Sequence, residues 1–256
     1  MLKIEVLIST MYQNDHSLLE RMNIQTDAIV VNQCETFGYE VFQFRGHTIK
    51  WFDFPERGVG LSRNTALMRA TGDILLFADD DVIYDDGYEK IVIDAYTKHP
   101  KAGMIVFNVP SVNPKYINKF VQKDIRLCIL NCLKYGTCRF SARREVVFRK
   151  NVFFSLLFGG GAKYQAGEDS LFILQMIRKG VVTVASSSKI GVVTQVTSTW
   201  FKGYTNRYYL DKGAWLSHAF PVLKKFLIYY FAAKMDKIDN DHTYSEIFKL
   251  IKNGFV

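Results

Sequence analysis

The sequence predicts a protein of the α/β class, with a mostly parallel sheet covered by helices on both faces. Two observations support this prediction. Almost continuously apolar runs at residues 3–9, 27–31 and 73–78 are typical of strands buried on both faces. Segments with helical periodicity lie between these runs, as parallel strands require for their crossover connections.

The remaining elements follow from the same patterns. Segment 114–151 is less regular, and we expect a helix near 116–130 and then short strands. From residue 204 the pattern is helical and aromatic, so we expect a main domain at 1–214 and a C-terminal amphipathic helical appendage at 215–256. Further strands are predicted at 41–44, 48–54, 102–109, 181–185 and 190–196, and helices at 15–22, 61–70, 86–98 and 170–179.

Composition limits the classes of partner. The chain has 256 residues, 48% of them hydrophobic, which suffices for one large domain. The net charge of +8 suits an anionic partner, either a phosphorylated substrate or an anionic membrane surface. The basic residues form no single block and no recognisable nucleic-acid motif, so we expect no nucleic-acid partner.

Several kinds of protein are disfavoured by simple counts. Four scattered cysteines are too few for a disulfide scaffold, and the five histidines form no pair spaced for zinc. Glu5 interrupts the first apolar run, which is too short for a signal peptide. No run approaches the roughly 20 apolar residues of a membrane span. We therefore expect a cytoplasmic protein, with contact to the inner face of the cell membrane left open.

An acidic cluster provides the strongest chemical signal. Asp79, Asp80 and Asp81 directly follow an apolar strand, and in open α/β sheets ligands bind beyond the carboxyl ends of the strands. Adjacent carboxylates repel one another unless a cation lies between them. Asp79 and Asp81 can therefore converge on Mg²⁺ or Mn²⁺. An EF-hand loop is excluded because Tyr84 stands where glycine is needed, and a plain acidic turn is the alternative.

A glycine-containing segment precedes this cluster. The stretch RGVGLSRN at 57–64 contains part of a dinucleotide fingerprint, but Arg63 occupies the third glycine position. The glycines permit close backbone approach, and the following helix turns its N-terminus toward an anion. Arg57 and Arg63 could pair with phosphate or hold the acidic cluster. A loop with a helix cap is the alternative.

Together these stretches resemble the centre of the family 2 glycosyltransferases. Residues 57–67 (RGVGLSRNTAL) and 70–81 (ATGDILLFADDD) match the "A-R-N" helix start and the "G-D-x-(apolar)-D-x-D" strand end of that family. The resemblance extends over about residues 1–215. It implies a GT-A fold, which is Rossmann-like, and a nucleotide-sugar donor. It also implies a divalent metal, Mn²⁺ or Mg²⁺, and in most members inversion at the anomeric carbon.

The resemblance also assigns donor contacts. Asp81 becomes the main metal ligand, with Asp79 also on the metal. Members often carry an acidic residue at the end of the second strand, where this chain has Asn32 and Gln33. An amide can pair with uracil, so we expect a UDP-sugar, although this departure leaves the base open. The residues expected to bind the donor are Ser9, Thr10, Gln33, Arg57, Arg63, Asp79 and Asp80.

A second glycine-rich segment, GGGAKYQAGEDS at 159–170, enters a predicted helix with acids in its first turn. Taken alone, this is favourable helix electrostatics. In similar glycosyltransferases a Glu-Asp pair stands here and its aspartate is the general base. The resemblance therefore makes Asp169 the base, lets Glu168 help to hold the acceptor, and lets the acceptor approach Gly160 and Gly161.

Two features remain open. Trp200 could stack on a sugar ring or simply pack, and Lys202, Arg207 and Lys212 could close over the leaving diphosphate as a flexible loop. In the tail, apolar residues recur at helical spacing from Trp215 to Tyr230. Such a helix can lie on an anionic membrane, pack on the main domain, or join a second subunit in a homodimer.

The sequence thus predicts an inverting glycosyltransferase of the hexosyltransferase class. We expect it to move a sugar from a nucleotide-diphosphate donor to a hydroxyl of a glycan or lipid-linked glycan in polysaccharide biosynthesis. One alternative is a catalytically inactive nucleotide-sugar-binding protein. Another is a sugar nucleotidyltransferase, although that class would carry a glycine-rich loop directly after the first strand, and residues 9–14 do not form one.

Overall fold

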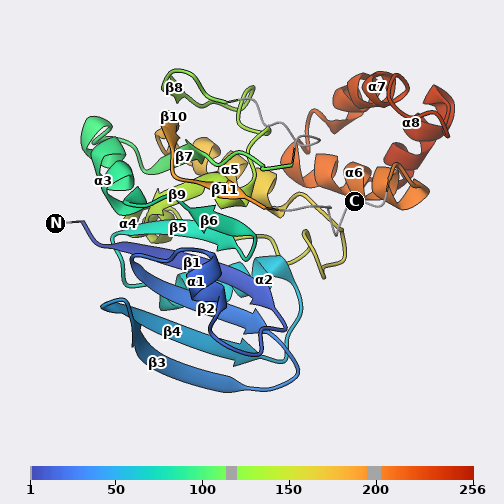
Figure 1. Cartoon of the computed structure of the whole chain (residues 1–256). Coiled ribbons are helices and arrows are strands. Elements are labelled where there is room, and N and C mark those ends of the chain that lie inside the picture. The colour runs from blue at the N-terminus through green and yellow to red at the C-terminus, as the bar shows by residue number, and fades with distance from the viewer. Residues whose placement is uncertain (1, 114–119, 195–202) are drawn as a thin grey trace.

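The computed structural model describes residues 2–113, 120–194 and 203–256 (Figure 1). Its centre is a nine-stranded sheet with the order β3-β4-β2-β1-β5-β9-β7-β10-β8. A separate antiparallel pair joins β6 (Val82–Tyr84) to β11 (Gly191–Val193). The nine strands are β1 Ile4–Met11, β2 Asp27–Gln33, β3 Gly38–Phe44, β4 His47–Phe54, β5 Ile74–Asp79, β7 Met104–Asn108, β8 Ile125–Arg126, β9 Phe140–Arg143 and β10 Thr183–Lys189.

The sheet is mostly parallel, as predicted. The strands β4, β2, β1 and β5 run in the same direction, and β7 and β10 share it, whereas β3, β8 and β9 run the opposite way. Ser9 of β1 lies opposite both Val31 of β2 and Asp79 of β5. This register brings the carboxyl ends of three buried strands to one edge of the sheet.

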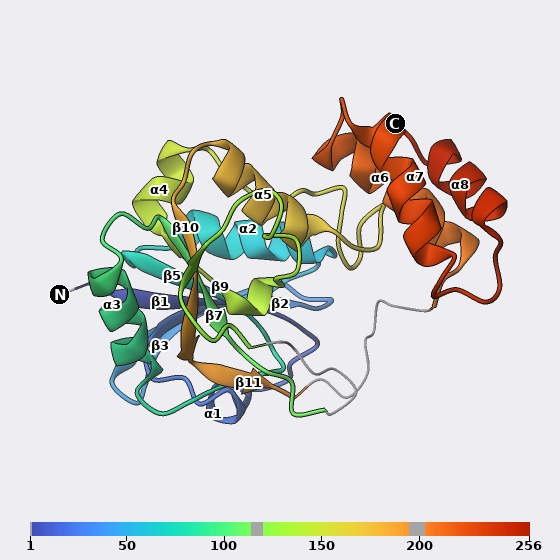
Figure 2. The ribbon, with the colours of Figure 1, turned by 90° about the horizontal axis from the view of Figure 1, so that it is seen from above.

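Helices cover both faces of the sheet (Figure 2). On one face lie α2 (Val59–Arg69), α4 (Arg144–Arg149) and α5 (Glu168–Arg178), which share a core with Leu7 and Phe77. On the other lie α1 (Leu18–Arg21) and α3 (Tyr88–Lys98), which share a core with Val6 and Ile8. Alternate residues of β1 therefore enter opposite cores, which explains why its apolar run has no polar face.

Three helices form the C-terminal region: α6 (Asn206–Ala219), α7 (Lys224–Met235) and α8 (Tyr244–Asn253). The expected boundary at residue 214 falls within α6, so the helical region starts at Asn206. A Cβ added at Gly213 would lie 2.0 Å from the carbonyl oxygen of Ile251, which shows how closely α6 approaches α8. The buried residues of these helices belong to the same core as α5.

The helix expected near 116–130 is wrong for the part of it that the structure describes. From residue 120 onward the segment forms turns and the short strand β8, which pairs with β10. The side chain of Asn108 exchanges two hydrogen bonds of 3.0 Å with the backbone of Val121. The backbone groups here bond to a side chain and to the sheet, so they are not available for a helical ladder. Within the described ranges, no helix is long and apolar enough to cross a membrane.

Candidate active site

The carboxyl edge of the sheet brings the predicted donor residues together. Thr10 Oγ1 donates a 2.6 Å hydrogen bond to Asp80 Oδ2. Ser62 of α2 donates a 3.0 Å hydrogen bond to Ser9, which is the neighbour of Asp79 in the sheet register. The first strand, the acidic cluster and the start of α2 thus meet at one place.

Arg63 links the two acidic segments of the sequence. Its side chain is 4% exposed, and it donates to Asp79 Oδ1 at 2.7 Å and to Glu168 Oε1 at 2.8 Å. Burial alone would lower the pKa of Arg63, but the two carboxylates outweigh burial and raise it. A single buried cation therefore joins the end of β5 to the start of α5.

The acidic cluster has the donor chemistry of a hard divalent cation. Asp81 forms no ion pair among the described residues, and burial, followed by repulsion from Asp79 and Asp80, raises its pKa to about 6. No group of three or more metal-ligand side chains occurs in the described ranges. Mg²⁺ is commonly held by one or two carboxylates together with substrate phosphates. The carboxylate oxygens of Asp79 and Asp81 are of the kind that such a cation takes as ligands.

Asp169 lies in the first turn of α5, next to the residue that Arg63 holds. Ser170 N donates to Asp169 Oδ1 at 2.6 Å, and the side chain keeps partial exposure. Dense packing around the carboxyl raises its pKa well above the usual range, Glu168 adds to this effect, and Arg63 opposes it. A carboxylate with a raised pKa and access to solvent suits a general base.

The glycine-rich segment packs on the start of α2. Val59 N donates to Gly160 O at 2.9 Å. Gly159 has φ +105°, and a Cβ there would lie 2.6 Å from Val59 Cγ1. Gly161 has φ +79°, and its Cβ would lie 3.0 Å from the backbone nitrogen of Gly58. Close packing and positive φ thus both require glycine, and the loop fixes the entry to α5.

The end of β2 carries Gln33 and neighbours Arg57. The Gln33 side chain is 3% exposed, and its Oε1 has no partner in the part of the chain that the structure describes. Arg57 donates to Cys34 O at 3.0 Å and to Tyr12 Oη at 2.8 Å, and it pairs with Glu35. Glu35 is an acidic side chain just past the second strand, two residues beyond Gln33, and it was not among the predicted donor residues.

Among the cations expected over the diphosphate, Arg207 and Lys212 lie on α6 and not in a flexible loop. Thr205 caps this helix by accepting from Tyr208 N at 3.3 Å, so the helix begins at Asn206. Arg207 Nε pairs with Asp211 Oδ1 at 2.8 Å. Lys212 Nζ lies 4.5 Å from the Trp215 ring centroid. Trp200 and Lys202 lie outside the described residues.

The ammonium group of Lys212 interacts electrostatically with the carboxyl of Asp169, the candidate base. Burial lowers the pKa of Lys212 to about 8, Lys234 adds to this effect, and the carboxyl of Asp169 partly opposes it. Its ammonium group also lies 5.0 Å from the Phe231 ring centroid. Lys212 therefore lies against two aromatic rings of the helical region, and its burial there accounts for the lowered pKa.

Trp215, which the sequence places in the apolar tail, is a neighbour of the site. Its Nε1 donates to Ser170 Oγ at 3.0 Å, and Ser170 Oγ in turn donates to Gly167 O at 3.0 Å. A Cβ added at Gly167 would lie 2.4 Å from Trp215 Cδ1. The C-terminal helices therefore contact the turn that carries Asp169.

Residues 13–154 match the sequence model of Glycosyl transferase family 2. The chain belongs to this family. The match confirms the resemblance found at residues 57–82, and it identifies the chain as a glycosyltransferase. No curated protein matches the chain in sequence.

Solved structures of S. aureus TarS are similar in fold. TarS 1–349 in complex with UDP-GlcNAc has a TM-score of 0.65 at 16% identity, covering 92% of this chain and 72% of that one. TarS 1–349 in complex with UDP has a TM-score of 0.64 at 15% identity, covering 92% and 71%. TarS 1–349 has a TM-score of 0.61 at 15% identity, covering 99% and 70%. At this identity the likeness concerns the fold, and it confirms the predicted GT-A arrangement.

Proposed function

We propose that this chain is an inverting glycosyltransferase of the cytoplasm that moves a sugar from a UDP-sugar to a hydroxyl of a glycan or lipid-linked glycan. The observation that carries the proposal is the bridge from Asp79 through Arg63 to Glu168. It connects the donor end of β5 directly to the turn that carries Asp169. A binding protein without chemistry would not need the two acidic segments joined in this way. All four cysteines are free, which suits a reducing compartment.

The donor would lie along the carboxyl edge of the sheet. Its base would contact the ends of β1 and β2, where Ser9, Thr10 and Gln33 lie. A buried amide oxygen without a hydrogen-bond partner lowers the stability of the fold by about 1–3 kcal/mol. Gln33 Oε1 is such an atom among the described residues, so its presence here lowers stability. The UDP assignment draws on this amide and on the fold likeness to TarS, which was crystallised with UDP and with UDP-GlcNAc.

The diphosphate would sit beside the acidic cluster. A divalent cation held by Asp79 and Asp81 would neutralise the negative charge that develops on the leaving group. Arg57, and Arg207 and Lys212 of α6, would supply further positive charge to the diphosphate. We retain Lys202 as a diphosphate contact, and Trp200 as a platform for the sugar ring of the acceptor.

Asp169 would act as the general base. Its carboxylate accepts the proton of the acceptor hydroxyl as the oxygen forms a bond to the anomeric carbon. The bond from that carbon to the diphosphate breaks on the opposite face, so the configuration inverts. Glu168, held by Arg63, keeps the first turn of α5 in place and helps to position the acceptor beside Gly161.

Calorimetric titration with UDP and GDP, with and without Mn²⁺, together with a donor-turnover assay, tests these assignments. Asp81→Asn should abolish the Mn²⁺-dependent part of UDP binding. Asp169→Asn should retain UDP binding and lower kcat by at least about a hundredfold, the lower end of general-base effects. Retained turnover in Asp169→Asn would exclude it as the base.

The pH profile of the wild-type enzyme provides an independent check. The base works as the carboxylate, so kcat should rise with pH through an acid limb set by the raised pKa of Asp169. An ordinary aspartate titrates near pH 4. The acid limb should therefore lie well above pH 4. A limb near pH 4, or turnover independent of pH from 4 to 8, would contradict the environment described for this carboxyl.

A further inference from the structure

The outward face of α7, with the turn before it, exposes a set of large apolar side chains. Val222 is 83% exposed and Phe226 is 74% exposed. Leu223, Tyr229 and Tyr230 are also more than half exposed. Positions 226, 229 and 230 are three and four apart, so they share one side of the helix. We call these five residues the α7 patch.

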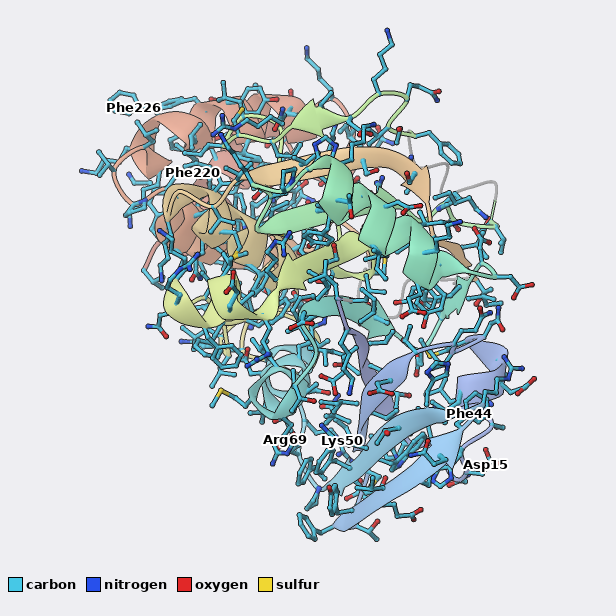
Figure 3. All side chains as sticks on the ribbon, turned by 90° about the vertical axis from the view of Figure 1, so that its left-hand side faces the viewer. Asp15, Phe44, Lys50, Arg69, Phe220 and Phe226 are labelled. Carbon is cyan, nitrogen blue, oxygen red and sulfur yellow. The ribbon has the colours of Figure 1, made fainter. Side chains whose placement is uncertain are left out.

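The inward face of the same helix packs it against the rest of the protein. Ile228, Ala232 and Met235 are buried and belong to the core shared with α5. The α7 patch therefore is not needed to hold the helix in the fold. Single exposed apolar residues are normal on a protein surface, but five within nine positions mark an interaction surface. Figure 3 places Phe226 at the outer edge of the molecule.

The side chains around the α7 patch are mainly positively charged, which indicates an anionic partner. Lys225, Lys234 and Lys237 are exposed beside it, and Asp236 is the one acidic residue between positions 222 and 238. Aromatic side chains flanked by lysines fit an anionic lipid surface. The rings enter the boundary between head groups and acyl chains, and the ammonium groups meet the anionic head groups.

We propose that the α7 patch docks this glycosyltransferase on an anionic membrane surface. The helix has 12 residues and so spans about 18 Å, which is long enough to lie in the interface and too short to cross a bilayer. In Figures 1 and 2 the C-terminal helices lie on the side to which the carboxyl ends of β1 and β2 point. The inference itself stands on the α7 surface and does not depend on the proposed donor or base.

Vesicle co-sedimentation tests the proposal with phosphatidylcholine vesicles that contain increasing fractions of phosphatidylglycerol. The wild-type chain should bind the anionic vesicles at low salt, bind less as salt rises, and bind pure phosphatidylcholine weakly. Phe226→Glu combined with Tyr230→Glu should weaken binding at least about tenfold, because both rings leave the interface and two negative charges arrive.

The matched control is Phe37→Glu, since Phe37 is also 74% exposed but precedes β3 at the far edge of the sheet. This variant should bind vesicles like the wild type. A double Lys225→Gln, Lys237→Gln variant should lose much of the dependence on phosphatidylglycerol. UDP binding should be unchanged in all three variants, which separates failure of docking from failure of the donor site.

Three outcomes would overturn the proposal. The first is no binding of the wild type to anionic vesicles at low salt. The second is an equal loss of binding in Phe37→Glu. The third is a concentration-dependent dimer in analytical ultracentrifugation that Phe226→Glu with Tyr230→Glu abolishes, without vesicle binding, which would assign the patch to a second copy of the chain.

Discussion

At the scale of single residues, Arg63 decides how the site is built. It is buried, and it pairs with one carboxylate from β5 and one from α5. Removing one partner from a buried ionic network leaves the others uncompensated, which is typically worth 3–5 kcal/mol. Here Asp79 remains 38% exposed, so water offsets part of that loss.

We therefore expect Arg63→Met, which keeps most of the side-chain length, to lower the free energy of unfolding by about 2–4 kcal/mol. Urea denaturation followed by circular dichroism measures this change. Arg69→Met is the matched control, because Arg69 lies on the same helix but is exposed, and it should cost less than about 1 kcal/mol. Equal losses in the two variants would mean that the bridge adds nothing beyond ordinary helix packing.

At the scale of elements, α6 supports the turn that carries the candidate base. Trp215→Phe keeps an aromatic ring against Gly167 but removes the hydrogen bond to Ser170. The loss of one such bond costs about 1 kcal/mol of stability. Because this turn orients Asp169, we also expect kcat to fall several-fold while the KM for the donor stays unchanged.

A double-mutant cycle with Ser170→Ala checks this coupling. The two substitutions should be clearly non-additive in kcat, since each one breaks the same contact. Tyr96→Phe is the control, because it removes a buried 3.0 Å hydrogen bond to Ser141 on the opposite face of the sheet. It should cost similar stability and leave kcat unchanged. Additive effects on kcat would show that Trp215 does not act through Ser170.

Which elements the sequence could predict depends on where their hydrogen bonds go. The backbone groups of strands such as β1, β2 and β5 form their hydrogen bonds within the sheet, and the apolar runs of these strands predict them. The start of α6 depends on the cap at Thr205, which was overlooked, and the segment after Val121 depends on a side chain distant in sequence, Asn108. The acidic cluster is predicted from a local motif and Asp169 from the family resemblance, and their roles stay predictions. Trp215 contacts the site through tertiary structure that no local pattern predicts, whereas Glu35 lies two residues past the end of β2 and carries a local signal.

At the scale of the whole molecule, the C-terminal helices and the sheet share one core. Tyr209 and Trp215 of α6, Ile228 of α7 and Ile251 of α8 belong to the same buried cluster as Leu7 and Phe172. Elements that share a core tend to unfold as one cooperative unit, whereas an appendage with its own core opens separately at lower free energy. The boundary expected at residue 214 would place α7 and α8 in such an appendage.

The shared core predicts a single transition, and Ile251→Ala can test it. Removing this buried side chain should destabilise the chain by about 2–5 kcal/mol and shift the unfolding of the strands together with that of the helices. Amide hydrogen exchange, followed separately for β1 and for α8, would show equal losses of protection. Ile238→Ala is the matched control, since Ile238 is about half exposed and should shift neither segment. Loss of protection confined to α6–α8 would instead make the helical region an independent unit. In that case Trp215 would support the turn of Asp169 only while that unit stays folded.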